Sequence, residues 1–189
     1  MRRRPLEPEP DNTGGGKSMS RTHVPTKVLA EASLVIALSF ILKDILPPIY
    51  ALPQGGAVTI AGLVPLLWFS LRRGPYYGAF AGFVYGLIHM AYGGYVINPV
   101  QGALDYPIAF AALGLAGFFR KYPLVGVGVA IVGRFVASFV SGMVFFTSLT
   151  VEGAIGSAIY NGTYLLGEFI ISAIVIYLLI QRKLLDIYL

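Results

Sequence analysis

The chain has 189 residues, of which 56% are hydrophobic and only 12% charged. Soluble domains carry about 25% charged residues, and a soluble fold of this length has too little interior to hide so much apolar surface, so the composition favours a membrane protein. The absence of cysteine excludes disulfides, thiolate metal sites and cysteine nucleophiles, and two histidines are too few for a histidine-rich metal site.

Residues 1–27 differ in composition from the rest of the chain. They are rich in proline, glycine, arginine and acidic residues, and they show no apolar periodicity. Such a segment cannot bury enough apolar surface to fold. We therefore expect a disordered cytoplasmic tail over residues 1–27 and a membrane domain over residues 28–189.

Six continuous apolar segments follow in chain order. Because apolar and polar residues do not alternate in them, the segments predict helices, and most approach the roughly 20 residues that a helix needs to cross the hydrocarbon core. The sequence therefore predicts an all-α integral membrane protein built as a bundle of six transmembrane helices. The expected helices are roughly Val28–Leu46, Ala57–Leu71, Tyr76–Tyr92, Val100–Phe119, Leu124–Phe146 and Ala158–Ile180.

Lysine and arginine side chains indicate the orientation of this bundle. The loops after the second and fourth expected helices hold Arg72, Arg73, Arg120 and Lys121, whereas the loops after the first, third and fifth hold none. Both tails are basic as well. Since cytoplasmic loops are enriched in these residues, we expect both termini in the cytoplasm of a plasma-membrane protein. This placement explains the net charge of +5 without a nucleic-acid partner.

Charged residues inside the expected helices need partners, because an unpaired charge in the bilayer is costly. Asp105 lies in the fourth helix and Arg134 near the middle of the fifth. We expect them to approach one another or to share a polar ligand; a purely structural ion pair is the alternative. Glu31, Lys43 and Asp44 lie near the ends of the first helix, where an interfacial or structural role suffices.

Glycines and polar side chains indicate a ligand cavity on the side away from the cytoplasm. The first loop contains Gly55-Gly56 and the third Gly93-Gly94, and glycine lets the backbone approach a ligand closely. Glu168, in the last helix, is expected either to face this cavity or to make a helix contact. The other polar residues expected near the cavity are Asn98, Gln101, Tyr106, Tyr160, Asn161 and Tyr164.

Motifs for catalysis are missing from the sequence. It has no Ser/His/Asp set, HExxH motif, pair of catalytic carboxylates or genuine nucleotide-binding loop, so we expect neither an enzyme nor a metal site. It also has no detectable inverted repeat, which favours a binding subunit over an autonomous pump. A membrane structural protein, whose polar pairs only lock the helices together, is the alternative from another class.

Several short segments of the chain form a recognisable series. They are Leu52–Leu67, Ser70–Gly74, Gln101–Pro107, Gly114–Gly117, Arg134-Phe135, Ser141-Gly142 and Tyr160–Tyr164. In these segments and their order, the chain resembles the thiamin-specific S components of energy-coupling-factor (ECF) vitamin transporters, and the resemblance covers about residues 28–183. The six-helix topology inferred from hydropathy agrees with this family.

This resemblance implies the substrate-binding subunit of an ECF-type ABC importer. Such subunits bind a vitamin from outside, in a cavity closed by the loop between the first two helices, and they associate with a transmembrane coupling protein and two ATPases. ATP is used by those partners, so no cofactor is expected in this chain. Ser33 and Ala37 stand where the family offers an Ala-x-x-x-Ala surface to the coupling protein. Thiamin is the expected ligand, and another vitamin or a pyrimidine precursor is the alternative.

The resemblance also implies site residues, position by position. Asp105 and Tyr106 match the acidic–tyrosine pair that contacts the aminopyrimidine and the cationic ligand, although glutamate is usual at the first position. Arg134 matches the basic residue, Gly142 a glycine, and Asn161 the amide. 

Three positions depart from the family's pattern. Ser138 stands where the family has histidine, Phe146 where some members have tryptophan, and Gly156 where a tyrosine is found. Phe146 can still stack on a ring, whereas the other two changes remove polar contacts. Ser138 and Phe146, together with Gln101 and Gly56 from the polar and glycine-rich segments, complete the expected ligand-binding set.

Overall fold

The first helix joins a short turn of wider helix. The structure is a computed structural model that describes residues 25–183, so residues 1–24 of the expected tail and residues 184–189 lie outside the described residues. α1 (Thr26–Phe40) continues without a break into one π-helical turn, η1 (Ile41–Ile45). Such turns are frequent at functional sites, and η1 carries the charged pair Lys43-Asp44.

A small hairpin follows α1 where the sequence predicted the start of a helix. β1 (Tyr50–Ala51) and β2 (Ala57–Val58) pair antiparallel around the 3-10 turn η2 (Pro53–Gly55). α2 covers only Val64–Arg73, so the prediction of a helix from Ala57 is wrong for its first part. The backbone N–H of Thr59 donates to Glu168 on the last helix instead of to a helical carbonyl. Most of the segment before α2 is therefore covered by protein, although Ile60 is 52% exposed.

The third, fourth and fifth predicted helices begin within one residue of the predicted positions. All three start at a proline, which is favoured there because its missing N–H has no helical partner to lose. The last helix begins earlier than the predicted Ala158, because the Thr150 side chain accepts a hydrogen bond from the Gly153 N–H and caps it. These elements are α3 (Pro75–Gly93), the nearly continuous series α4 (Pro99–Ala103), η3 (Leu104–Ile108), α5 (Ala109–Ala111) and η4 (Ala112–Phe119), then α6 (Pro123–Ser141) with η5 (Gly142–Phe146), and α7 (Val151–Gln181).

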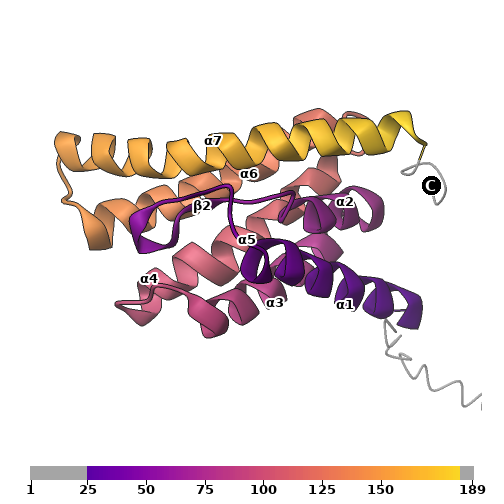
Figure 1. Ribbon diagram of the computed structural model, residues 1–189, viewed down its shortest axis with the longest axis horizontal. Helices are drawn as coiled ribbons and strands as arrows, with labels where there is room; N and C mark the ends of the chain where they lie inside the picture. The colour runs from indigo at the N-terminus through magenta and orange to yellow at the C-terminus, as the bar shows by residue number, and fades with distance from the viewer. Residues whose placement is uncertain (1–24, 184–189) are drawn as a thin grey trace, which may run out of the picture.

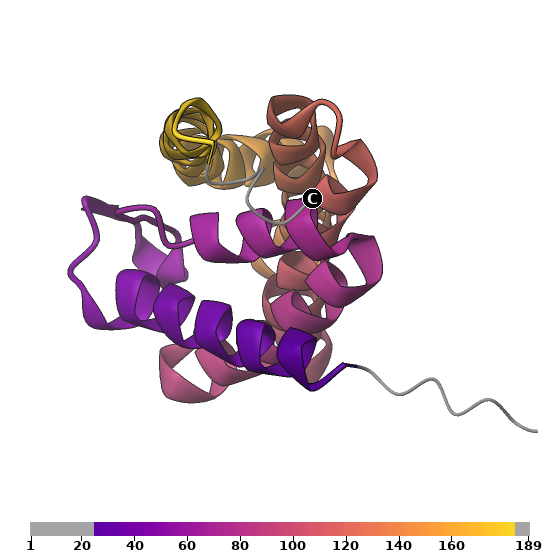
Figure 2. The same ribbon diagram turned by 90° about the vertical axis from the view of Figure 1, so that its right-hand side faces the viewer.

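The helices pack side by side as a bundle (Figures 1 and 2). α7 runs along one side against α6, while α3 packs against α2 and η4, and α1 packs on α2 and α3. α1 begins and α7 ends at the same end of the bundle (Figure 1). Near that end, Glu31 of α1 accepts two hydrogen bonds of 2.6 Å from Arg73 and one of 3.3 Å from Arg72, which ties α1 to α2.

α7 buries several polar side chains and exposes apolar ones, which is the opposite of a surface helix in a soluble protein. Its buried face includes Ser157, Asn161, Glu168 and Ser172. Between its two ends its exposed large side chains are mostly apolar, among them Ile155, Ile159, Leu166, Ile170 and Ile174. An apolar outer surface around a polar interior is what a bilayer requires of a helix that it surrounds.

By length and composition, three continuous helical segments of the described residues are able to cross a membrane. They are Pro99–Phe119, Pro123–Phe146 and Val151–Gln181. α2, with 10 residues, is too short, because at 1.5 Å per residue it extends about 15 Å, half the thickness of the hydrocarbon core.

Candidate substrate-binding site

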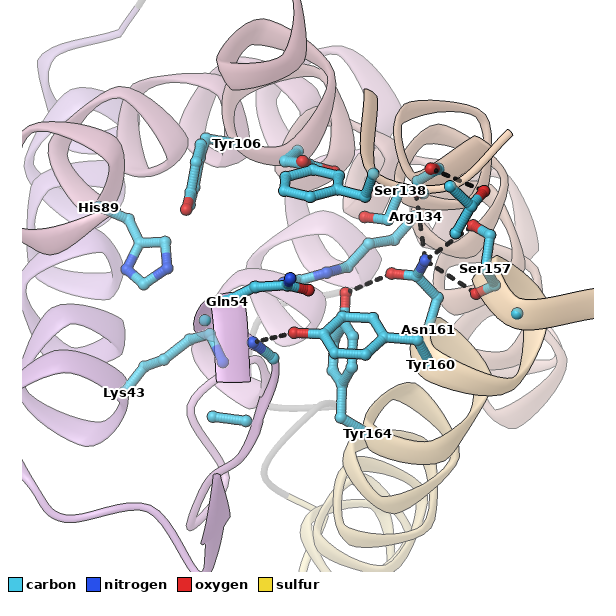
Figure 3. A pocket seen from close by; sticks show the side chains of 18 residues that line it. Lys43, Gln54, His89, Tyr106, Arg134, Ser138, Ser157, Tyr160, Asn161 and Tyr164 are labelled. Atoms are coloured by element: carbon cyan, nitrogen blue, oxygen red, sulfur yellow. Dashed lines mark hydrogen bonds between the residues drawn. The ribbon is translucent and has the colours of Figure 1, made fainter. Parts of the chain in front are cut away.

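A cavity of about 280 Å³ lies beneath the loop of the hairpin. Its walls come from η1, α3, η3, α6, η5 and α7, so segments from across the chain meet there (Figure 3). Ligand pockets of roughly 300–1,000 Å³ are usual, so this cavity suits a small molecule. It is lined by Lys43, Gln54, Gly55, Gly56, Ala57, His89, Asp105, Tyr106, Arg134, Ser138, Gly142, Phe146, Thr147, Gly156, Ser157, Tyr160, Asn161 and Tyr164.

Asp105 presents one carboxylate oxygen to the cavity. Its Oδ2 accepts hydrogen bonds from Gln101 Nε2 at 2.6 Å and from Ser141 Oγ at 2.8 Å. Its Oδ1 accepts none from the residues that the structure describes. Gln101 is 1% exposed and does not line the cavity, so the structure does not bring it together with the other expected ligand contacts. Gln101 instead orients Asp105, while its own Oε1 accepts the Ile97 N–H at 3.0 Å.

Arg134 lines the same cavity without forming an ion pair with Asp105. Its guanidinium carbon lies 3.9 Å from the centre of the Phe110 ring, which is a cation–π contact. The residue is 5% exposed, and its Nε and Nη1 atoms are buried without a hydrogen-bond partner among the described residues. The expected direct Asp105–Arg134 pair is therefore wrong. Both residues line one cavity, and the alternative that they share a polar ligand stays a prediction.

Asn161 is held by its neighbours on α6 and α7. Its amide nitrogen donates to the carbonyl oxygens of Ser157 at 3.0 Å and Ser138 at 3.3 Å, and its Oδ1 accepts from the Tyr164 hydroxyl at 3.1 Å. These bonds fix the amide in the cavity wall. Gly142 permits this packing, because a Cβ there would collide with the Ser157 hydroxyl and lie 3.3 Å from the Asn161 amide.

The hairpin loop closes the cavity through contacts with α7. The Gly56 N–H donates to the Tyr160 hydroxyl at 3.0 Å, and that hydroxyl donates to the Pro53 carbonyl. Gly56 must be small, because a Cβ would come within 2.9 Å of both Tyr160 and Tyr164. Gln54, at the tip, adopts a left-handed backbone conformation with φ of 66°. The conformation of the loop thus depends on its left-handed turn, and the loop packs against Tyr160 and Tyr164.

Lys43 and Asp44 lie inside the protein, so of the two roles left open for them, interfacial or structural, these contacts agree with the structural one. Lys43 Nζ is 3.2 Å from Glu168 Oε1, with side-chain exposures of 5% and 1%. Asp44 pairs with His89 of α3, and its side chain is 4% exposed. Two adjacent residues of η1 thus both have a partner inside the protein: Lys43 contacts a carboxylate, and Asp44 contacts an imidazole. Glu168 therefore makes a helix contact, one of the two roles left open for it, and does not line the cavity.

Phe146 and Gly156 occupy the remaining side of the cavity. Phe146 lies against Tyr95, with ring centroids 6.0 Å apart. A Cβ on Gly156 would touch only a Thr147 methyl at 3.7 Å, so this position leaves free space beside the cavity. The Tyr160 ring, one turn further along α7, supplies an aromatic hydroxyl to the same wall.

Eight of the nine expected ligand-contacting residues thus line one cavity, and the ninth, Gln101, is buried next to Asp105 outside the lining. Sequence reasoning missed Lys43 and His89, whose only signal was their charge or titratable nitrogen inside an apolar helix. Ser33 and Ala37 lie elsewhere, on an exposed face of α1. Lining residues that no pattern singled out are Thr147 and Ser157.

Comparison with known proteins gives a consistent result. The family described as "Thiamine transporter protein (Thia_YuaJ)" matches residues 29–187. The chain belongs to this family. Thiamine transporter ThiT of Bacillus subtilis (strain 168) is 35% identical over 171 residues, which cover 80% of this chain and 88% of that protein. Thiamine transporter ThiT of Lacticaseibacillus paracasei is 31% identical, covering 61% of this chain and 69% of that protein.

A solved structure agrees with the fold of this thiamine transporter family member. ThiT from Listeria monocytogenes superposes with a TM-score of 0.74 at 23% identity, covering 84% of this chain and 95% of that one. The family resemblance seen in the sequence is therefore confirmed. The chain is a multi-pass protein of the plasma membrane and a transporter subunit rather than an enzyme.

Proposed function

We propose that this chain is the thiamin-binding S component of an ECF-type importer. In this proposal six helices form the membrane domain, both termini lie in the cytoplasm, and thiamin enters the cavity from outside. A coupling protein and two ATPases complete the transporter and supply the ATP-driven step. The expected set of ligand-binding residues, with Gln101 now in a supporting position, forms the site.

The electrostatics of the cavity carry this proposal. Five charged side chains lie in or beside it: Lys43, Asp44, Asp105, Arg134 and Glu168. With two positive and three negative groups and a neutral His89, the net charge is −1. Thiamin carries one permanent positive charge on its thiazolium ring, so it would neutralise the site. In a low-dielectric interior such a balance matters more than it does in water.

The polar and aromatic side chains that line the cavity also suit the chemical groups of thiamin. The free Oδ1 of Asp105 accepts hydrogen bonds, which suits the amino group of the aminopyrimidine. Tyr106, Phe146 and Tyr160 offer aromatic faces for the two rings and for the cation. Because the loop covers the cavity through Gly56, part of the ligand's surface would be removed from water.

The proposed orientation rests on the cations at one end of the bundle. Arg72 and Arg73 at the end of α2 and Arg182 after α7 lie at the end where α1 begins, whereas the cavity loop lies toward the other end (Figure 1). The positive-inside rule assigns the basic end to the cytoplasm. Helices α1 and α3 complete the membrane domain beside the three long helical segments, and the short α2 is extended by the hairpin that precedes it.

Titration calorimetry of the purified protein in detergent tests this function. Calorimetry is preferable to intrinsic fluorescence, because Trp68 does not line the cavity and the chain has one tryptophan. We expect tight one-to-one binding of thiamin and weaker binding of its phosphate esters, its pyrimidine precursor and riboflavin. Thiamin at about 1,000 times its Kd should raise the free energy of unfolding by about 4 kcal/mol. Tightest binding of another compound would replace thiamin as the ligand, and no stabilisation by any of them would contradict a binding subunit.

A further inference from the structure

His89 presents an imidazole to the cavity from α3. It lies with Lys43 and Tyr106 on one side, across from Ser138, Ser157 and Asn161 (Figure 3). Its ring stacks on Tyr85 with centroids 5.8 Å apart and an interplanar angle of 14°, and it also packs against Tyr106 and Phe110. Three aromatic neighbours therefore fix the plane of the ring.

Asp44 determines which nitrogen of this ring carries a hydrogen. Its Oδ1 contacts Nδ1 of His89, and its Oδ2 accepts a hydrogen bond of 2.7 Å from the Tyr85 hydroxyl. An ionised carboxylate only accepts hydrogen bonds, so this network assigns the hydrogen to Nδ1. Nε2 is then left with a lone pair, and the negative partner makes it a better acceptor.

Nε2 of His89 has no hydrogen-bond partner among the described residues, while the side chain is 20% exposed in the cavity wall. Lys43 and Arg134 line the same cavity, so a second hydrogen on the imidazole would add a third positive charge beside them. The neutral ring with a free acceptor is the form that this environment favours. A ligand group that donates a hydrogen bond is its natural partner.

We propose that His89 contacts the ligand, with its Nε2 accepting a hydrogen bond from the ligand's hydroxyl group, and that Asp44 is the positioning residue for this contact. The inference rests on the proposed function, because thiamin carries its hydroxyethyl chain on the thiazolium ring, away from the aminopyrimidine. If the aminopyrimidine occupies the side of Asn161 and Ser138, the hydroxyl reaches the side of His89. His89 thereby selects for a ligand that ends in a hydroxyl.

Calorimetry with two ligands and the whole protein tests the contact. The ligands are thiamin and the analogue in which the hydroxyethyl chain is replaced by ethyl. Wild type should bind the ethyl analogue about 5–30-fold more weakly, which is the range for one hydrogen bond. His89→Phe keeps an aromatic ring but lacks the acceptor, so it should bind thiamin about 5–30-fold more weakly than wild type and bind the two ligands equally well. Ser138→Ala, on the opposite side, should keep the wild-type ratio.

The role of Asp44 has a test of its own. In Asp44→Asn, the Tyr85 hydroxyl keeps the side-chain oxygen as its acceptor, so the amide NH₂ faces Nδ1 and moves the ring hydrogen to Nε2. The O-methyl ether of thiamin, which accepts but does not donate, should then gain affinity relative to thiamin, whereas His89→Phe should show no such gain.

Two results would overturn the proposal. One is a wild type that binds the ethyl analogue as tightly as thiamin, which needs no variant. The other is an unchanged ratio of the two affinities in His89→Phe. A wild type that binds other vitamins but not thiamin would instead overturn the proposed function, and this inference with it.

Discussion

Lys43 Nζ and Glu168 Oε1 lie 3.2 Å apart in the interior, joining the end of the first helix to the middle of the last. The same Glu168 oxygen accepts hydrogen bonds from the backbone N–H of Thr59 at 3.0 Å and from its hydroxyl at 2.7 Å. One carboxylate thus holds η1, the segment after β2 and α7 together. Since β2 belongs to the hairpin over the cavity, this contact connects the stability of the bundle to the placement of the loop.

Removing one partner of this pair should be strongly destabilising. Lys43→Met leaves the Glu168 charge unpaired, and Glu168→Gln does the same to Lys43, so each should lower the free energy of unfolding by about 3–5 kcal/mol. The double variant Lys43→Met/Glu168→Gln keeps an acceptor for Thr59 and should be more stable than either single variant. Equilibrium unfolding in mixed detergent micelles measures these differences.

Glu31→Gln is the control for this pair. Glu31 is 18% exposed beside Arg73 at 24%, so solvent screens that interaction and the cost should stay within about 1 kcal/mol. Equal losses for Glu31→Gln and Glu168→Gln would contradict a special role for the buried pair.

Asp105→Asn should weaken thiamin binding about tenfold or more. The substitution removes the negative charge that faces the ligand but preserves the side chain's size and its hydrogen-bonding positions, so a charge-assisted hydrogen bond of about 1.5–3 kcal/mol is lost. Asn161→Ala should cause a similar loss by releasing the wall between α6 and α7. Titration calorimetry gives the Kd. Glu31→Gln should bind like wild type, and wild-type affinity in both site variants would refute this site.

Gly56→Ala should speed the release of thiamin. The added Cβ would lie 2.9 Å from the Tyr160 hydroxyl and from a Tyr164 ring carbon, so the loop must move away and lose its 3.0 Å hydrogen bond to Tyr160. We expect the dissociation rate to rise about tenfold or more, as for loss of one or two hydrogen bonds. A chase with unlabelled thiamin measures the rate. Gly162→Ala is the matched control, because a Cβ there meets nothing within 4 Å; equal rates for the two variants would contradict the prediction.

Ser33→Leu should separate partner docking from ligand binding. Ser33 is exposed on α1, and a larger side chain would keep a coupling protein's helix from approaching closely. Thiamin affinity should stay unchanged, while co-purification with a co-expressed coupling protein and its ATPases should be lost. Thr163→Leu is a close match, since Thr163 is also exposed and also donates to the carbonyl four residues earlier. Equal recovery of the complex with both variants would remove Ser33 from the docking surface.

The sequence predicted the long helices well because their hydropathy is continuous, but it misplaced the start of α2. Ala57–Leu63 is as apolar as a transmembrane helix, and apolarity alone does not tell lipid from protein as the surrounding medium. The difference lies in Thr59, whose backbone N–H has its partner on α7, 109 residues away. The local hydropathy pattern cannot predict a contact with a residue so far along the chain.

Most of the expected site residues that line the cavity were predicted through family resemblance, whereas the buried charges beside it were not. Lys43 near the end of an apolar run fits snorkelling as well as burial, and only its distant partner Glu168 decides between them. The same holds for Asp44 and His89, which come together across 45 residues. Gln101 is the opposite case, because a polar residue one turn from Asp105 is also placed to donate a hydrogen bond to that carboxylate, and the sequence does not distinguish this role from a ligand contact.

The polar face of α7 bears on the order in which the protein is assembled. Asn161, Tyr160 and Tyr164 complete the cavity, and Glu168 supplies the counter-charge of Lys43, yet all of them lie in the last helix to be synthesised. Until α7 is made, Lys43 therefore lacks its buried partner Glu168 and the cavity lacks one wall. The site can form only after α7 has joined the other helices, in one late step of biogenesis rather than helix by helix.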